Sequence, residues 1–91
     1  MPVTHVEILG RVQGVGFRWF ARELARTLDL AGWVMNREDG AVELAVTGDE
    51  EKVRQFLDAL ERGPVGSQVE SVRPLPIPGT ATLTRPFTIL R

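Results

Sequence analysis

The sequence contains no cysteine and a single histidine, and each shortage excludes a class of site. Without cysteine the chain forms no disulfide, offers no thiolate to a metal and has no cysteine nucleophile. A single histidine excludes metal sites built from several histidines, and it weakens any interpretation as a serine–histidine–aspartate hydrolase. These shortages favour a reaction that needs neither covalent cysteine chemistry nor a histidine-rich metal centre.

Long apolar runs and an excess of charge of one sign are also missing. No stretch approaches the roughly 20 apolar residues that span a bilayer, so we expect no membrane partner. The first residues lack the basic and apolar regions of a signal peptide, and we expect a cytoplasmic location. The formal net charge is −1, which provides no general basic surface for nucleic acid.

Length and composition indicate a small globular protein. The chain has 91 residues, of which 43% are hydrophobic and 25% are charged. Both values are close to globular averages. We predict a single domain over residues 1–91 with a compact two-layer fold, because this length leaves no room for two cores. Ordinary hydrophobicity gives no reason for a partner subunit, so we expect a monomer.

Periodic hydrophobic patterns predict strands and helices that alternate along the chain. The order is strand, helix, strand, strand, helix, strand and a short C-terminal strand. The strands are predicted at residues 3–12, 33–37, 41–47, 68–75 and 87–90. The first helix is predicted at residues 17–30, and the second opens at residues 48–51 and stops at Gly63-Pro64. This order is typical of the split βαβ arrangement, an α+β fold whose antiparallel sheet carries both helices on one face.

Glycine and proline positions predict how these elements end. Gly32 is expected just past the C-terminus of the first helix. Asp39-Gly40 predicts a hairpin with a type I′ turn, in which both central residues need positive φ. Pro78 and Gly79 predict a loop or a sheet edge. The large apolar residues expected in the core are Phe17, Phe20, Leu24, Trp33 and Phe56.

An RNA-recognition module of the same topology is a weaker alternative. Such modules need exposed aromatic side chains on their central strands. Here the central strands carry aliphatic residues such as Val6, Ile8, Val42 and Leu44. We therefore expect no nucleic acid among the partners.

The segment with the most chemical content, Val12-Gln13-Gly14-Val15-Gly16-Phe17-Arg18, joins the first strand to the first helix. Its two glycines let the backbone turn so that N–H groups converge at a helix N-terminus, where four amides lack partners. Arg18 follows in the first turn, where its guanidinium can contact two phosphate oxygens. The loop lacks the lysine of a Walker A motif and the full dinucleotide fingerprint. From the residues alone, a phosphate loop and a plain glycine-rich turn both remain open.

Two motifs, in the expected order and spacing, resemble the signatures of the acylphosphatase family. The first runs from Ile8 to Arg18, and the second is Gly32-Trp33-Val34-Met35-Asn36 followed by Gly40, Val42 and Gly48. The resemblance covers nearly the whole chain and implies a ferredoxin-like two-layer α/β sandwich. It also implies a hydrolase that cleaves the carboxyl–phosphate bond of small acyl phosphates to carboxylate and inorganic phosphate, without a metal or cofactor.

The resemblance assigns roles to residues of both motifs. It implies that Asn36 orients the attacking water and that Arg18 makes the charged contact to phosphate. The residues implied to bind the substrate are Gln13, Gly14, Val15, Gly16, Phe17 and Arg18. The alternative is a non-catalytic phosphate or carbamoyl-phosphate binding or regulatory module of the same fold.

Two further side chains have open roles in the sequence. Trp19 lies roughly opposite the apolar stripe of its helix, where it either packs on a loop or shields the acyl end of a substrate. His5 shares a strand face with Glu7, and we expect a structural role for it.

Overall fold

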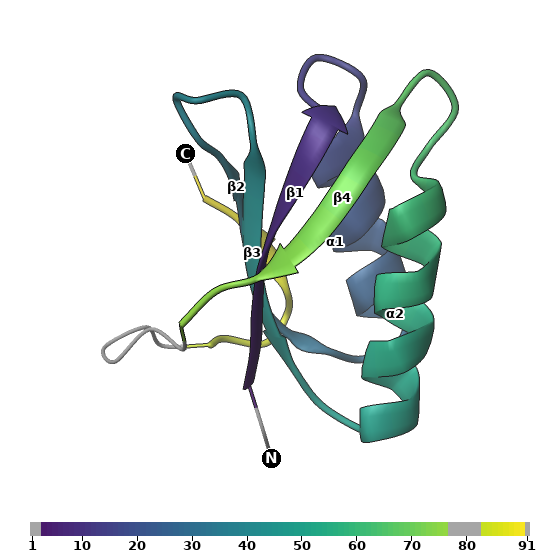
Figure 1. Cartoon of the computed structure of the whole chain (residues 1–91). Coiled ribbons are helices and arrows are strands. Elements are labelled where there is room, and N and C mark those ends of the chain that lie inside the picture. The colour runs from purple at the N-terminus through teal and green to yellow at the C-terminus, as the bar shows by residue number, and fades with distance from the viewer. Residues whose placement is uncertain (1–2, 77–82, 91) are drawn as a thin grey trace.

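The computed structural model describes residues 3–76 and 83–90, in which two helices pack on one face of a five-stranded sheet (Figure 1). The elements are β1 (Val3–Arg11), α1 (Phe17–Thr27), β2 (Ala31–Asn36), β3 (Val42–Thr47), α2 (Glu50–Arg62), β4 (Gln68–Pro74) and β5 (Thr88–Ile89). Their order confirms the sequence prediction. Pro78 and Gly79 lie outside the described residues. Neither described helix has the length and apolar character needed to cross a lipid bilayer.

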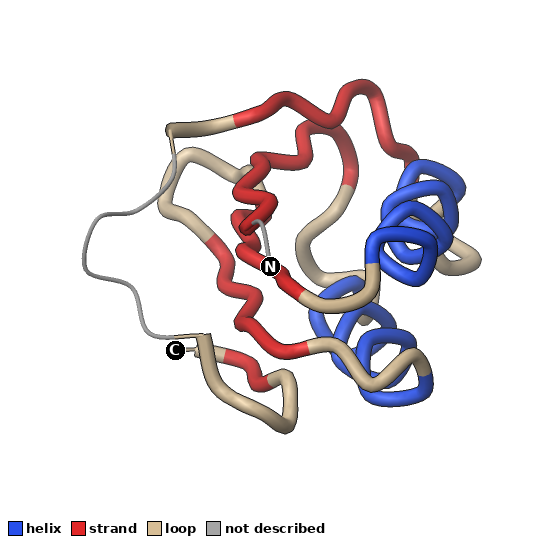
Figure 2. The backbone as a smooth tube through the Cα atoms, turned by 90° about the horizontal axis from the view of Figure 1, so that it is seen from below, coloured by secondary structure: helices blue, strands red, loops and turns tan. Residues whose placement is uncertain are grey.

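The strands of the sheet lie in the order β4-β1-β3-β2-β5. β1 pairs with β3 and β4, and β2 pairs with β3, all antiparallel as predicted. The short β5 pairs with β2 in parallel, so the complete sheet is mixed. Figure 2 shows that the two helices form one layer and the strands the other. The fold is the predicted ferredoxin-like α+β sandwich.

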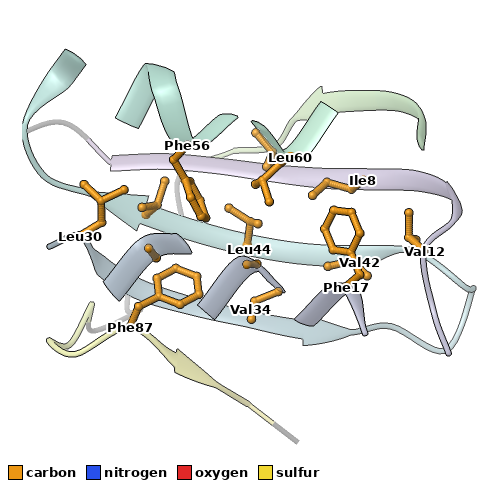
Figure 3. Close-up of a cluster of buried hydrophobic side chains, with 14 residues drawn as sticks. Ile8, Val12, Phe17, Leu30, Val34, Val42, Leu44, Phe56, Leu60 and Phe87 are labelled. Atoms are coloured by element: carbon orange, nitrogen blue, oxygen red, sulfur yellow. The ribbon is translucent and has the colours of Figure 1, made fainter. Parts of the chain in front are cut away.

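The core lies between the helices and the sheet. Along β1, Val6 and Ile8 face the helices while His5 and Glu7 face away, because successive strand residues point to opposite sides. Figure 3 shows the buried side chains from both layers interlocking. They are Val6, Ile8, Val12, Phe17, Ala21, Ala25, Leu30, Val34, Val42, Leu44, Val46, Phe56, Leu60 and Phe87. Phe20 and Leu24 are half-buried against this cluster.

Trp33 was predicted in the core, and that prediction is wrong. Its neighbour Val34 is fully buried under the helices, so strand alternation turns Trp33 to the helix-free face. There its ring meets the ring of His5 edge-on, with centroids 5.7 Å apart. Hydrophobicity alone favours burial, and the register of β2 decides which face receives the indole.

The first helix ends at Thr27 rather than at the predicted Leu30. The chain leaves the helix through Asp29, which has a left-handed φ of 56°. The Asp29 amide donates to the Arg26 carbonyl at 3.1 Å, and the Leu30 amide donates to the Ala25 carbonyl at 2.9 Å. These two bonds form a Schellman cap. The sequence hides it, because aspartate occupies the position where glycine is usual.

Gly32, predicted at the end of the helix, lies instead within β2. Its φ is 142°, and a Cβ built there would lie 2.0 Å from the carbonyl oxygen of Ala45 in β3. Glycine is therefore required by the close approach of two strands and not by a helix terminus.

The β2–β3 hairpin also differs from its prediction. Gly40 has a φ of 95°, but Asp39 keeps a negative φ, so the connection is not a type I′ turn. The Gly40 amide donates to the Arg37 carbonyl at 3.3 Å, and the Arg37 amide donates to the Ala41 carbonyl at 2.8 Å. This pattern is the longer hairpin in which an ordinary turn precedes one left-handed glycine.

The cap at Asp29 predicts how substitutions there change stability. A left-handed conformation costs an alanine roughly 1–2 kcal/mol and a glycine almost nothing. Asp29→Gly is therefore expected to have a free energy of unfolding about 1 kcal/mol above that of Asp29→Ala, measured by urea denaturation. Both variants lose the exposed ion pair to Arg85, so their difference isolates the backbone. Equal stabilities would contradict the cap.

Candidate active site

The loop between β1 and α1 presents unpaired backbone amides. Gly14 and Gly16 have left-handed φ values of 74° and 78°, whereas Val15 between them has a negative φ. Alternation of this kind directs successive N–H groups toward one point. The first hydrogen bond of the helix is donated by the Phe20 amide to the Gly16 carbonyl at 3.0 Å. The amides of residues 15–19 have no acceptor in the described part of the chain.

The electrostatic setting of these amides favours an anion. They lie at the N-terminus of α1, the positive end of its dipole. The first turn of α1 contains no acidic side chain, and its N-cap residue Gly16 has no side chain with which to cap the amides. By contrast, α2 is capped by Asp49, whose carboxylate accepts from the Lys52 amide at 3.1 Å. Of the two described helices, only α1 leaves its N-terminus uncapped by a side chain.

The loop borders a hollow of about 180 Å³. Its lining comes from the loop, the start of α1 and the ends of β2 and β5. The residues are Val12, Gly14, Gly16, Phe17, Arg18, Trp19, Asn36 and Ile89. Arg18 is the only charged residue among them. Figure 1 shows why these segments meet: the β1–α1 connection and the β2–β3 hairpin lie at the same end of the sheet.

A larger hollow of about 420 Å³ lies along α2, and it is unsuited to an anion. Three carboxylates line it, those of Glu50, Asp58 and Glu61, against the single cation of Arg54. Like charges would repel a phosphate there. The chemistry of the lining therefore selects the smaller hollow, despite the difference in volume.

Arg18 places a guanidinium without a partner among the described residues at the smaller hollow. Its side chain is half-buried, and it forms no hydrogen bond or ion pair with residues 3–76 or 83–90. Two arginines further along the same helix are engaged: Arg22 pairs with Glu23 at 3.0 Å, and Arg26 donates to the Phe87 carbonyl at 3.0 Å. A guanidinium that is partly desolvated and unpaired gains most from an anionic guest.

Asn36 lies at the end of β2, where it faces Val42 in β3. Its carboxamide oxygen is buried and accepts no hydrogen bond from any described residue. An unsatisfied buried acceptor costs about 1–3 kcal/mol, so it calls for a donor from outside the described residues. Because Asn36 and Arg18 line the same hollow, that donor and an anion on Arg18 would be close neighbours.

The sequence profile of the acylphosphatase family matches residues 4–89. This chain belongs to the acylphosphatase family. It is 48% identical to an acylphosphatase of Moorella thermoacetica over 70 residues, which cover 77% of this chain and 75% of that protein. It is 49% identical to an acylphosphatase of Koribacter versatilis, over 71% of this chain and 59% of the longer relative. The family assignment confirms the predicted class of enzyme, a hydrolase of acyl phosphates.

The fold agrees with this assignment over the full length. The crystal structure of acylphosphatase from Bacillus subtilis superposes with a TM-score of 0.83 and 36% sequence identity, and the match covers 100% of both chains. The relationship therefore includes the loop, the hairpin and the C-terminal strand.

The acylphosphatase motifs separate into residues that line the hollow and residues that support it. Gly14, Gly16, Phe17, Arg18 and Asn36 line it, as expected of a site. The side chains of two other predicted residues point elsewhere: that of Val15 packs against the core, and that of Gln13 reaches the hairpin. Val12 and Ile89 also line the hollow but were not among the predicted binding residues, because neither side chain has a polar group.

Gln13 connects the acylphosphatase loop to the hairpin that follows Asn36. Its side-chain amide donates to the Arg37 carbonyl at 2.8 Å and to the Ala41 carbonyl at 3.0 Å. These two residues close the hairpin, because the Arg37 amide also donates to the Ala41 carbonyl. One carboxamide thereby holds the loop that carries Arg18 against the strand that carries Asn36.

Arg37 braces the same hairpin from the helix-free face. Its guanidinium donates to Glu7 of β1 at 2.7 Å and to Asp39 within the hairpin. The bond from Arg37, followed by that from the Ala41 amide, holds the pKa of Asp39 below its ordinary value. Because the folded pKa is the lower one, this contribution to stability is complete above the ordinary carboxyl pKa. It is lost as the pH falls through the lowered pKa.

His5 lies on the same face, in the structural role that we expected. Its Nε2 is 2.7 Å from a carboxylate oxygen of Glu43, and its Nδ1 is 2.6 Å from the Pro76 carbonyl. His5 does not line the hollow: it lies near the start of β1, whereas the loop follows the other end of that strand.

The contact of Gln13 predicts a loss of order in the hairpin when its side chain is removed. Gln13→Ala leaves two part-buried carbonyls without this donor and is expected to lower the free energy of unfolding by about 1–2 kcal/mol. Gln13→Glu keeps the shape but sets a carboxylate against both carbonyls, so it should cost more. Urea denaturation measures the stability, and hydrogen exchange of the Arg37 amide measures the hairpin. Unchanged exchange in Gln13→Ala would contradict the role.

Proposed function

We propose that the hollow is where this chain hydrolyses acyl phosphates to a carboxylate and inorganic phosphate. The observation that carries the proposal is the meeting of an unpaired guanidinium, a set of unpaired amides and an orphaned carboxamide at one small hollow. The first two groups need an anion, and the third needs a hydrogen-bond donor. A phosphate group together with a water molecule satisfies all three.

The phosphate group is held by the loop and by Arg18. The amides of residues 15–18 donate to its oxygens, and the planar guanidinium contacts two of them. Charge on those oxygens is stabilised as the bond to the acyl group breaks, because the donors are already in place and need not reorganise. Of the predicted binding residues, Gln13 contributes by holding the loop to the hairpin.

Asn36 positions the water. Its buried carboxamide oxygen accepts from the water, which fixes the direction of the water lone pair toward phosphorus. The water attacks phosphorus directly, the bond from phosphorus to the acyl oxygen breaks, and the electron pair leaves with the carboxylate. The proton lost by the water passes to solvent or to phosphate. No covalent enzyme intermediate forms.

The lining of the hollow limits the reaction to phosphates with good leaving groups. None of its eight residues is an acid or a histidine, so the lining supplies no general acid for an alkoxide leaving group. An acyl phosphate expels a carboxylate whose conjugate acid has a pKa of about 4, and this group leaves unprotonated at neutral pH. Phosphoryl transfer through a loose transition state depends mainly on positioning and charge stabilisation.

The monomeric state, the cytoplasmic location and the extent of the domain over residues 1–91 stay predictions. They rest on features of the sequence such as its length and composition, and the lack of cysteine is compatible with a reducing compartment.

The proposed activity predicts release of phosphate from benzoyl phosphate at neutral pH with the full rate retained in EDTA. The reason is that loop amides and a guanidinium, rather than a metal, stabilise the charge. Ultraviolet absorbance follows the loss of the acyl phosphate. Binding of phosphate without turnover would contradict the proposal and favour the non-catalytic module, whereas loss of the rate in EDTA would show that a metal takes part.

Substitutions of Arg18 and Asn36 are predicted to change the kinetic constants in different ways. Arg18→Gln is expected to weaken inhibition by inorganic phosphate, raise KM and lower kcat, because the cation contacts phosphate throughout the reaction. Asn36→Ala is expected to lower kcat by the equivalent of about 3–4 kcal/mol of barrier with little change in KM, because the water matters mainly in the transition state.

Arg22→Gln is the matched control, since Arg22 lies on the same helix and outside the lining. It should leave both kinetic constants near those of the wild type. A near-normal kcat in Asn36→Ala would overturn the role of that carboxamide, and unchanged phosphate inhibition in Arg18→Gln would overturn the role of the guanidinium.

A further inference from the structure

Trp19 occupies an unusual position for a large aromatic residue. It follows Arg18 in the first turn of α1 and is 59% exposed. Its indole N–H has no acceptor, and its ring meets no other aromatic ring, in the part of the chain that the structure describes. Among the described residues, the packing role considered from the sequence is therefore supported neither by a hydrogen bond nor by an aromatic contact. Trp19 is also one of the residues that line the hollow.

The lining of the hollow divides into a polar part and an apolar part. Gly14, Gly16, Arg18 and Asn36 provide amides, a cation and a carboxamide, which suit a phosphate and a water. Trp19 and Ile89 provide apolar surface. Ile89 comes from β5, which is held beside β2 by the hydrogen bond from the Leu90 amide to the Val34 carbonyl at 2.8 Å. A site that binds only phosphate does not need this apolar surface.

The volume and the chemistry of the substrate account for the apolar part. A hollow of about 180 Å³ offers more space than a five-atom phosphate group fills. In an acyl phosphate, the acyl group is joined to phosphorus through one bridging oxygen. The acyl group of a substrate whose phosphate is held by Arg18 therefore lies near Trp19, which lines the same hollow.

We infer that Trp19, with Ile89 beside it, recognises the acyl group and directs the enzyme toward acyl phosphates with an aromatic or bulky apolar acyl group. The inference rests on the proposed function and adds a substrate preference to it. An indole provides a large rigid surface for stacking at small entropic cost. The small acyl group of acetyl phosphate offers that surface only a methyl group.

The test compares kcat/KM for benzoyl phosphate and acetyl phosphate in the wild type, Trp19→Ala and Trp19→Phe. The expected result is that Trp19→Ala lowers kcat/KM for benzoyl phosphate by roughly 3- to 10-fold, the range of one aromatic contact, and changes that for acetyl phosphate less than twofold. Trp19→Phe should keep most of the preference. Inhibition by inorganic phosphate should stay unchanged in both variants, because the phosphate contacts are separate.

A binding measurement tests the same contact without turnover. In a Trp33→Phe background, Trp19 is the only indole, and its fluorescence reports on the hollow. Phenacylphosphonate, in which CH₂ replaces the bridging oxygen, should quench this fluorescence, and acetonylphosphonate and inorganic phosphate should do so far less. These ligands share the charged end and differ only in the group offered to the indole.

The outcomes separate the two proposals. Hydrolysis of both substrates by the wild type with an unchanged ratio of kcat/KM in Trp19→Ala would overturn the acyl-recognition role alone. An equal loss for both substrates, with a lower unfolding midpoint, would assign Trp19 a structural role instead. Failure of the wild type to hydrolyse either substrate would overturn the proposed function, and the acyl preference with it.

Discussion

Left-handed backbone at Gly14 and Gly16, which both line the hollow, turns the chain from β1 into α1 and leaves the amides of residues 15–19 without an acceptor among the described residues. A Cβ added at either glycine would meet no atom within 4 Å apart from its chain neighbours, so the space is open and the requirement is conformational. Any other residue would resist the positive φ. The anion binding proposed for the site depends on this turn, because Arg18 is placed by the helix that the turn begins.

The proposed chemistry needs a second segment, and tertiary contacts bring it. Asn36 is on β2, and the loop is joined to the end of that strand through Gln13. The hairpin is braced in turn by Arg37 against β1, the strand from which the loop emerges. The two halves of the site are thus tied to each other and to one common strand. This arrangement suits a reaction that depends on positioning rather than on a strong acid or base.

The order of elements and most of the core could be predicted from the sequence. The spacing of apolar residues and the positions of glycine and proline depend on neighbouring residues along the chain, so they can be recognised without the tertiary structure. The predictions were wrong at residues whose type is compatible with more than one structural role. Gly32 resembled a helix terminus but serves a close strand contact, and Asp29 caps the helix without the usual glycine. Trp33 is apolar enough for the core, yet β2 register places it on the other face.

For the site, the sequence by itself determined the turn, the positive end of α1 and the presence of Arg18 beside it, since these depend on neighbouring residues along the chain. Only the tertiary structure decided that the carboxamide of Gln13 supports the hairpin, that the Asn36 carboxamide oxygen accepts no hydrogen bond from a described residue, and that Ile89 lines the same hollow as Trp19. Those relations join segments distant in the chain, and they follow from strand order and register, which local propensity does not encode.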